Sequence, residues 1–152
     1  MLVTFQPEIS SGVRVVDMSG AVYGTKCCKD KAQQYVQKAA TESRTSRRAE
    51  KYCAVLFENA ACDSCRRLFS GWDTGIKVGK KTFGRLSRHR EDSASVIVAP
   101  GCIFVGYDES DEDDDNKRTI ASAVGRPDWV YKEFKVSNCH FSAVYYTFCS
   151  AI

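Results

Sequence analysis

The sequence of 152 residues lacks a long apolar run, has only two histidines and contains none of the compact motifs by which many enzymes are recognised. A bilayer-spanning helix needs about 20 mostly apolar residues, so none is expected. There is no Gly-x-Ser-x-Gly elbow, no phosphate-binding glycine loop and no metalloprotease helix. The net charge of +3 is modest and gives no reason to expect a nucleic-acid partner. We therefore expect a protein that binds or assembles, and not an enzyme.

Cysteine, by contrast, is abundant, with eight residues in a chain of this length. An even and high number of thiols is typical of secreted proteins, in which disulfides supplement a modest core. We expect an extracellular or secretory-granule protein with all eight bridged, while the pairing stays open. The first residues carry no basic segment or sustained apolar stretch, so we expect a mature form without a signal peptide. The cysteines are Cys27, Cys28, Cys53, Cys62, Cys65, Cys102, Cys139 and Cys149.

Two local cysteine patterns have competing interpretations. Cys27 and Cys28 are neighbours, a geometry that disfavours a bond between them and favours two different partners. Cys62 and Cys65 have the spacing of a zinc half-site or a redox pair. A zinc site needs two more ligands, and a redox pair normally opens a helix of an α/β fold. Structural disulfides are therefore the favoured interpretation.

The chain divides by composition into residues 1–51 and residues 52–152. The first part is expected to be an N-terminal extension, with a β-prone segment at Val13–Val16 and one helix over about residues 29–40. The second part has apolar, β-branched or aromatic runs at 53–57, 95–98, 102–105 and 141–148, which predict an all-β domain. The helix is predicted because apolar residues recur at three- and four-residue spacing, at Cys28, Ala32, Tyr35, Val36, Ala39 and Ala40.

The β-rich part contains an internal repeat of nearly fifty residues. Cys53 begins a run that ends in Phe57-Glu58, and Cys102, 49 positions later, begins a run that ends in Tyr107-Asp108. Each unit closes on a similar strand, at residues 94–96 and 142–144. Each unit is too small to bury a sheet face alone, so the repeat predicts two paired β-motifs that share one core.

These aromatic–acid pairs, the serine-containing turns at 92–95 and 142–143, and the Pro100-Gly101 connection resemble the βγ-crystallin family. The stretch from Ser95 to Cys102 resembles the syncollin-like proteins of that group. The resemblance covers about residues 52–149 and implies two four-stranded Greek-key motifs that form a β-sandwich. With the N-terminal extension and its short helix, this is the expected architecture.

Many βγ-crystallins bind calcium, so the resemblance also implies two positions to consider. The corresponding residues are Glu91, Asp92 and Ser95 in the first motif, and Asn138 and Ser142 in the second. Calcium prefers several hard oxygen ligands, and both turns have lost part of that set. We expect degenerate structural turns with weak calcium binding at most, and no other metal or cofactor.

Charge is segregated along the chain. Residues 108–115 carry seven carboxylates, whereas residues 66–90 are rich in lysine and arginine. The ordinary interpretation is solvated surface charge. The alternative is that opposite charges on different faces attract neighbouring molecules head to tail. The residues singled out for assembly are Asp111, Glu112, Asp113, Asp114, Asp115, Arg66, Arg67, Lys80, Lys81 and Arg88.

The leading hypothesis is a secreted, disulfide-stabilised structural or packaging protein that self-associates into a higher-order assembly. Its β-prone segment at Val13–Val16 is predicted either to join a neighbour's sheet or to fold back on its own domain. One alternative is a membrane- or glycan-directed effector, of toxin or defence type, that binds anionic membrane surfaces. The other is a calcium-modulated βγ-crystallin domain.

Overall fold

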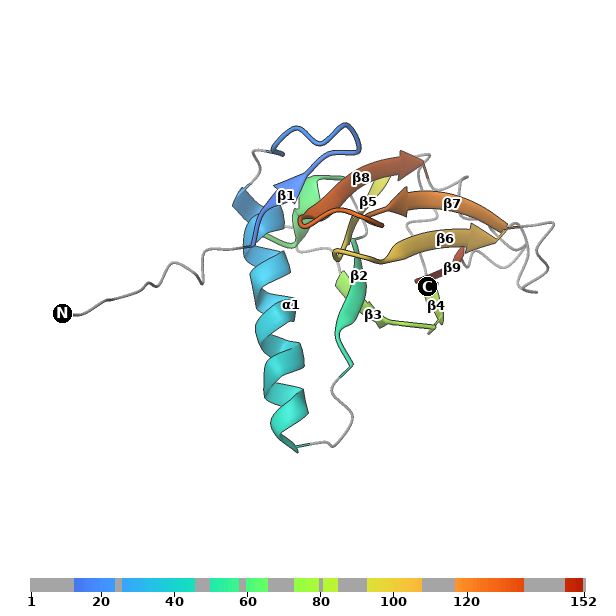
Figure 1. Ribbon diagram of the computed structural model, residues 1–152. Coiled ribbons are helices and arrows are strands. Elements are labelled where there is room, and N and C mark those ends of the chain that lie inside the picture. The colour runs from blue at the N-terminus through green and yellow to red at the C-terminus, as the bar shows by residue number, and fades with distance from the viewer. Residues whose placement is uncertain are drawn as a thin grey trace.

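The protein is β-rich, with one long helix and two sheets, as the sequence predicts at this level (Figure 1). The computed structural model describes residues 13–23, 26–45, 50–57, 60–65, 73–79, 81–84, 93–107, 117–135 and 147–151. Within these ranges the elements are β1 (Val15–Val16), α1 (Lys26–Thr45), β2 (Tyr52–Phe57), η2 (Ala60–Cys65), β3 (Asp73–Lys77), β4 (Lys81–Gly84), β5 (Ser93–Val98), β6 (Ile103–Tyr107), β7 (Lys117–Ser122), β8 (Trp129–Lys135) and β9 (Thr147–Ala151).

Strands β2 to β5 and strands β6 to β9 form two halves, and each half contributes one strand to the sheet that the other half mainly forms. The five-stranded sheet A has the order β1-β8-β5-β2-β3, and the four-stranded sheet B has the order β4-β9-β6-β7. Of the four strands β2 to β5, three lie in sheet A and β4 lies in sheet B. Of the four strands β6 to β9, three lie in sheet B and β8 lies in sheet A. All pairings except that of β1 with β8 are antiparallel.

Sheet A is the middle layer of the molecule. On one face, the Phe134 ring of β8 lies 6.2 Å from the Phe104 ring of β6, between the centroids, so this face packs on sheet B. On the other face, Ser95 of β5 accepts a hydrogen bond from the Cys62 amide of η2, and Asp73 of β3 contacts α1. Strand β2 is covered on both faces, and all six of its residues are buried. This explains why its sequence is continuously apolar and does not alternate.

Helix α1 is longer than predicted, since it begins three residues before Lys29 and extends to Thr45. Its buried stripe follows Cys28, Ala32 and Tyr35, and Ala39 is half-buried. The prediction that Val36 and Ala40 share this face is wrong, because Val36 is 45% exposed and Ala40 is exposed. A helix turns about 100° per residue, so a stripe at 28, 32, 35 and 39 leaves both neighbours at its margin. No helix in the described ranges is long and apolar enough to cross a membrane.

The N-terminal β-prone segment pairs within its own molecule. Of the predicted Val13–Val16, only Val15 and Val16 form a strand, which lies parallel to β8 with Val15 opposite Trp129 and Val16 opposite Val130. Both valines are buried in the main hydrophobic cluster. In this structure the segment therefore folds back on its own sheet.

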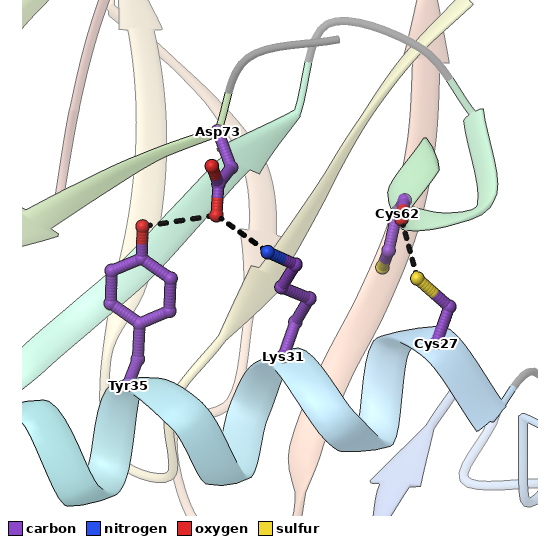
Figure 2. Close-up of polar contacts among 5 residues, drawn as sticks. All are labelled: Cys27, Lys31, Tyr35, Cys62 and Asp73. Carbon is purple, nitrogen blue, oxygen red and sulfur yellow. Dashed lines mark hydrogen bonds and ion pairs between the residues drawn. The ribbon is translucent and has the colours of Figure 1, made fainter. Parts of the chain in front are cut away.

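Two disulfides connect distant elements. Cys28 of α1 bonds Cys62 of η2, and Cys53 of β2 bonds Cys102, which precedes β6. Cys27 is also disulfide-bonded, and its Sγ lies 2.8 Å from the carbonyl oxygen of Cys62 (Figure 2). The prediction that Cys28 does not pair with its neighbour Cys27 is thus confirmed. Cys62 bonds Cys28 and therefore does not form a local pair with Cys65. Cys139 and the side chains of Cys65 and Cys149 lie outside the described part of the chain.

The η2 turn adopts a backbone conformation that non-glycine residues rarely take. Ala61 and Cys62 have φ of 58° and 55°, in the left-handed region. The Ala61 amide donates to the Tyr131 hydroxyl at 2.9 Å, and the Cys62 amide donates to Ser95 Oγ at 3.2 Å. Together with the bond to Cys28, these contacts hold the turn against sheet A, which offsets a strain of about 1–3 kcal/mol per residue.

Removing either disulfide should destabilise the fold while leaving the strands paired. We expect the double variants C28A/C62A and C53A/C102A each to lower the free energy of unfolding by about 2–4 kcal/mol, because each bond closes a long loop in the unfolded chain. Urea unfolding followed by circular dichroism measures this. Non-reducing peptide mapping of the unmodified protein should recover both pairs. An unfolding midpoint equal to that of the unmodified protein, in either variant, would contradict the assignment.

Candidate functional site

A row of polar side chains on α1 meets the edge of sheet A. Lys31 and Tyr35, one turn apart, both reach Asp73 at the start of β3 (Figure 2). The Lys31 ammonium lies 3.3 Å from Asp73 Oδ2, and the Tyr35 hydroxyl donates to the same oxygen at 3.1 Å. One carboxylate thus anchors two successive turns of the helix to the sheet.

A second carboxylate repeats this arrangement towards the end of the helix. Glu42 accepts a hydrogen bond from the Tyr52 hydroxyl, at 2.9 Å to one oxygen and 3.0 Å to the other. The Lys77 ammonium, at the end of β3, lies 3.2 Å from Glu42. Since Glu42 follows Tyr35 by seven residues, both lie on the same side of α1.

Between the two carboxylates, Tyr35 and Tyr52 pack edge to face. Their ring centroids are 5.1 Å apart at an interplanar angle of 80°, a favoured geometry for aromatic pairs. The Lys38 ammonium lies 5.3 Å from the ring centroid of Tyr35 and 5.5 Å from that of Tyr52, within the range of a cation–π interaction. A Cβ on Gly75 of β3 would lie 2.5 Å from Tyr35 and 2.8 Å from Tyr52. Only glycine leaves room for the two rings there.

The tyrosines of this region are held in their neutral form. Burial, reinforced by the charge of Asp73, raises the pKa of Tyr35. Burial and the hydrogen bond to Glu42 raise the pKa of Tyr52 to about 12. The bond from Tyr52 in turn lowers the pKa of Glu42 below its ordinary value of 4.5. At neutral pH the two hydroxyls therefore act as hydrogen-bond donors to carboxylates.

Beside this aromatic pair lies a pocket of about 300 Å³. It opens at the end of sheet A where β2 and β8 begin and β5 ends. Tyr35, Tyr52 and Trp129 are each more than nine-tenths buried and supply aromatic walls, while Val36 and Lys51 are exposed at its margin. The described residues that line it are Tyr35, Val36, Ala39, Lys51, Tyr52, Ala99, Pro100 and Trp129.

Lys51 is the one charged residue among these lining residues. Its ammonium donates a hydrogen bond to the Pro100 carbonyl oxygen at 2.8 Å, a contact between the segment before β2 and the turn after β5. An ammonium has three N–H donors, so this contact fixes the group and leaves two others to meet a ligand or water. The site can hold a mainly apolar molecule next to a positive charge.

Most residues that the sequence singled out lie elsewhere or outside the described ranges. Of the five residues at the predicted calcium-type turns, only Ser95 is described, and its buried hydroxyl accepts a hydrogen bond from the Cys62 amide. Lys81 lies in β4, and its side chain is not described. The described residues hold no group of three or more His, Cys, Asp or Glu side chains that could bind a metal. The remaining predicted residues lie outside the described part, namely Glu91, Asp92, Asn138, Ser142, Arg66, Arg67, Lys80, Arg88, Asp111, Glu112, Asp113, Asp114 and Asp115.

Sequence reasoning missed the residues that form the pocket. Tyr35 was placed on the buried helix face, but nothing linked it to Lys51, Pro100 or Trp129, which are distant in sequence. The available signal was the polar spacing of Lys31, Lys38 and Glu42 on the same helix. Together with the buried Tyr35 they recur at four-, three- and four-residue intervals, which indicates a helix margin that contacts other elements.

No protein-family model matches this chain, and no curated protein or solved structure matches it. The arrangement of its own residues therefore carries the functional argument.

Adding a methyl group at Gly75 should loosen the attachment of α1 to sheet A. We expect Gly75→Ala to lower the free energy of unfolding by about 1–3 kcal/mol, because the new Cβ overlaps both tyrosine rings. Urea unfolding is the measurement. Val78→Ala, at an exposed position just after the same strand, is the matched control and should change stability by less than about 0.5 kcal/mol. Equal effects of the two changes would contradict the packing described.

The Tyr52–Glu42 bond should make stability depend on pH. The folded-state pKa of Glu42 is lowered, so its contribution is present above the ordinary value of 4.5 and is lost as the pH falls through the lowered value. Tyr52→Phe should therefore cost most at neutral pH and progressively less in acid. Denaturant unfolding across this range measures the effect. In an E42Q background the cost of Tyr52→Phe should not vary with acid pH, and a dependence that persisted there would contradict the assignment to Glu42.

Proposed function

We propose that the chain is a secreted, disulfide-stabilised double Greek-key protein of the βγ-crystallin type, which acts by self-association and not by catalysis. The strand order is the observation that carries the proposal. In each half the fourth strand returns to lie beside the first, β5 beside β2 and β9 beside β6, as in a Greek key. The third strand of each half pairs in the other half's sheet, so the two halves are interlocked.

The cysteine bonds support an oxidising compartment. Cys28–Cys62 and Cys53–Cys102 link residues 34 and 49 positions apart, and no cysteine among the described side chains is free. Such bonds persist in extracellular and secretory environments and are uncommon in the reducing cytosol of most cells. These bonds favour secretion as the interpretation.

The charge pattern supports head-to-tail association. Among the described strands of sheet B, β4 and β7 are the two edges. Strand β4 begins with Lys81, follows Lys80, and precedes a connection that carries Arg85, Arg88 and Arg90. Strand β7 follows the connection that contains the seven carboxylates of residues 108–115. Segments of opposite charge are thus connected in sequence to the two edge strands of sheet B.

Edge strands carry unpaired backbone groups and can meet the edge of another sheet. A contact between the β4 edge of one molecule and the β7 edge of the next joins two different surfaces. Such heterologous contacts form closed rings or open filaments. Complementary charge increases the rate of encounter and fixes which edges meet, and salt weakens both effects.

Self-association should be strong at low salt and should depend on the acidic segment. We expect the sedimentation coefficient of the protein to rise with concentration at about 0.01 M salt and to fall to the monomer value at about 1 M. Neutralising three acids, in D113N/D114N/D115N, should reduce the low-salt association at least severalfold. Analytical ultracentrifugation measures both.

The matched control removes the same number of negative charges from exposed described positions away from the β7 edge. D30N/E50Q/E133Q should associate as strongly as the unmodified protein. Monomeric behaviour of the unmodified protein at low salt and high concentration would overturn the proposal. So would an equal loss of association in the two triple variants, since that reflects net charge and not a specific edge.

A further inference from the structure

We propose that the pocket between α1 and sheet A binds a small amphipathic anion, with a flat aromatic body and a single carboxylate or sulfonate. Its volume of about 300 Å³ is at the lower end of the range for small-molecule sites. This site is separate from the edges of sheet B on which the proposed self-association rests.

The walls favour a flat apolar body. Tyr35, Tyr52 and Trp129 lie on three different elements and converge on the same space. The hydroxyl hydrogens of both tyrosines are already donated to Asp73 and Glu42, so the tyrosines offer mainly ring carbon. Ala39, Ala99 and Pro100 add small apolar surfaces. Rings of this kind pack well against another aromatic ring, by stacking or edge to face.

The charges favour an anion. The two carboxylates next to the aromatic pair are each paired, Asp73 with Lys31 and Glu42 with Lys77. Among the described residues here, Lys38, over the tyrosine rings, and Lys51, at the pocket margin, add two further positive charges, and Glu50, next to Lys51 in sequence, adds one negative charge. The balance of these described charges is positive, and the Lys51 ammonium is held at the pocket margin by the Pro100 carbonyl.

The anionic group of the ligand is therefore expected at Lys51, with its ring against Trp129 and the two tyrosines. The ammonium keeps its bond to Pro100 and donates a second one to the carboxylate or sulfonate. For a ligand of this size an affinity between about 10 μM and 1 mM is reasonable.

Naphthalene-2-carboxylate and its neutral counterpart 2-naphthylmethanol form a matched probe pair. Titration into the ¹⁵N-labelled full chain, followed by amide chemical shifts, gives both the location and the dissociation constant. The acid should bind saturably, with shifts centred on Val36, Ala39, Tyr52 and the Trp129 indole, and several-fold more tightly than the alcohol. Lys51→Met should weaken binding of the acid about fivefold, as for an exposed ion pair, and leave the alcohol unchanged.

Ala39→Phe fills the pocket from the helix and should abolish binding of both probes. Its neighbour Ala40 is exposed and does not line the pocket, so the Ala40→Phe variant should bind both probes like the unmodified protein.

Absence of saturable shifts with the acid overturns the proposal. So does unchanged binding in Ala39→Phe, or an alcohol that binds as tightly as the acid. If Ala39→Phe fails to fold, the Lys51→Met comparison decides the outcome alone. The titration is run at about 0.15 M salt, where the Lys51 charge is only partly screened, and sedimentation in the same buffer shows the assembly state.

Discussion

The burial of β2 on both faces is the constraint on which the rest of the structure depends. All six residues from Tyr52 to Phe57 are buried, and a strand of this kind is stable only if each face has a cover. Sheet B supplies one cover and α1 with η2 supplies the other. One disulfide fastens each side. Cys53–Cys102 ties β2 to the residue before β6 of sheet B, and Cys28–Cys62 ties α1 to the η2 turn.

The cover formed by α1 differs in kind from the cover formed by sheet B. Between the sheets the contact is apolar, as the Phe104–Phe134 pair illustrates. Beneath the helix, only the first turns are apolar, and the contact then becomes polar as Tyr35, Asp73, Tyr52 and Glu42 replace aliphatic side chains. These hydrogen bonds are directional, so they fix the angle of the helix where packing is sparse. The pocket lies beside this polar contact, next to Val36 and Ala39 of α1.

The sequence predicted those features that depend on local pattern. The continuous apolar run at 53–57 predicted a strand, and the spacing of Cys28, Ala32 and Tyr35 predicted the inner face of a helix. The sequence underestimated the helix because residues 41–45 are polar, and a polar last turn is stabilised by tertiary bonds such as that of Glu42 to Tyr52. It overestimated the strand at Val13–Val16, since only Val15 and Val16 form a strand beside β8.

Features set by long-range geometry could not be read in this way. The Cys53–Cys102 bond joins the two positions that open the internal repeat, yet spacing alone gave no reason to pair them and not others. The pocket is a stronger case, since Trp129, Lys51 and Pro100 meet only because β2, β5 and β8 are neighbours in sheet A. Nothing in the local sequence around each of these residues indicates a binding site, and only the fold shows that they line the same pocket.

The same topology places the two proposed surfaces on different sheets. The pocket is formed by α1 and the end of sheet A where β2 and β8 begin, whereas the proposed contact edges are β4 and β7 of sheet B. The connections β3–β4, β5–β6 and β7–β8 meet sheet A at the pocket end, marked by the Val98–Val130 pair, and the connections β4–β5 and β8–β9 meet it at the Ser93–Lys135 end. The two sheets are therefore joined at both ends of sheet A, and β2 is buried between sheet B and α1. One disulfide ties β2 to the residue before β6, and the other ties α1 to η2 on the opposite face.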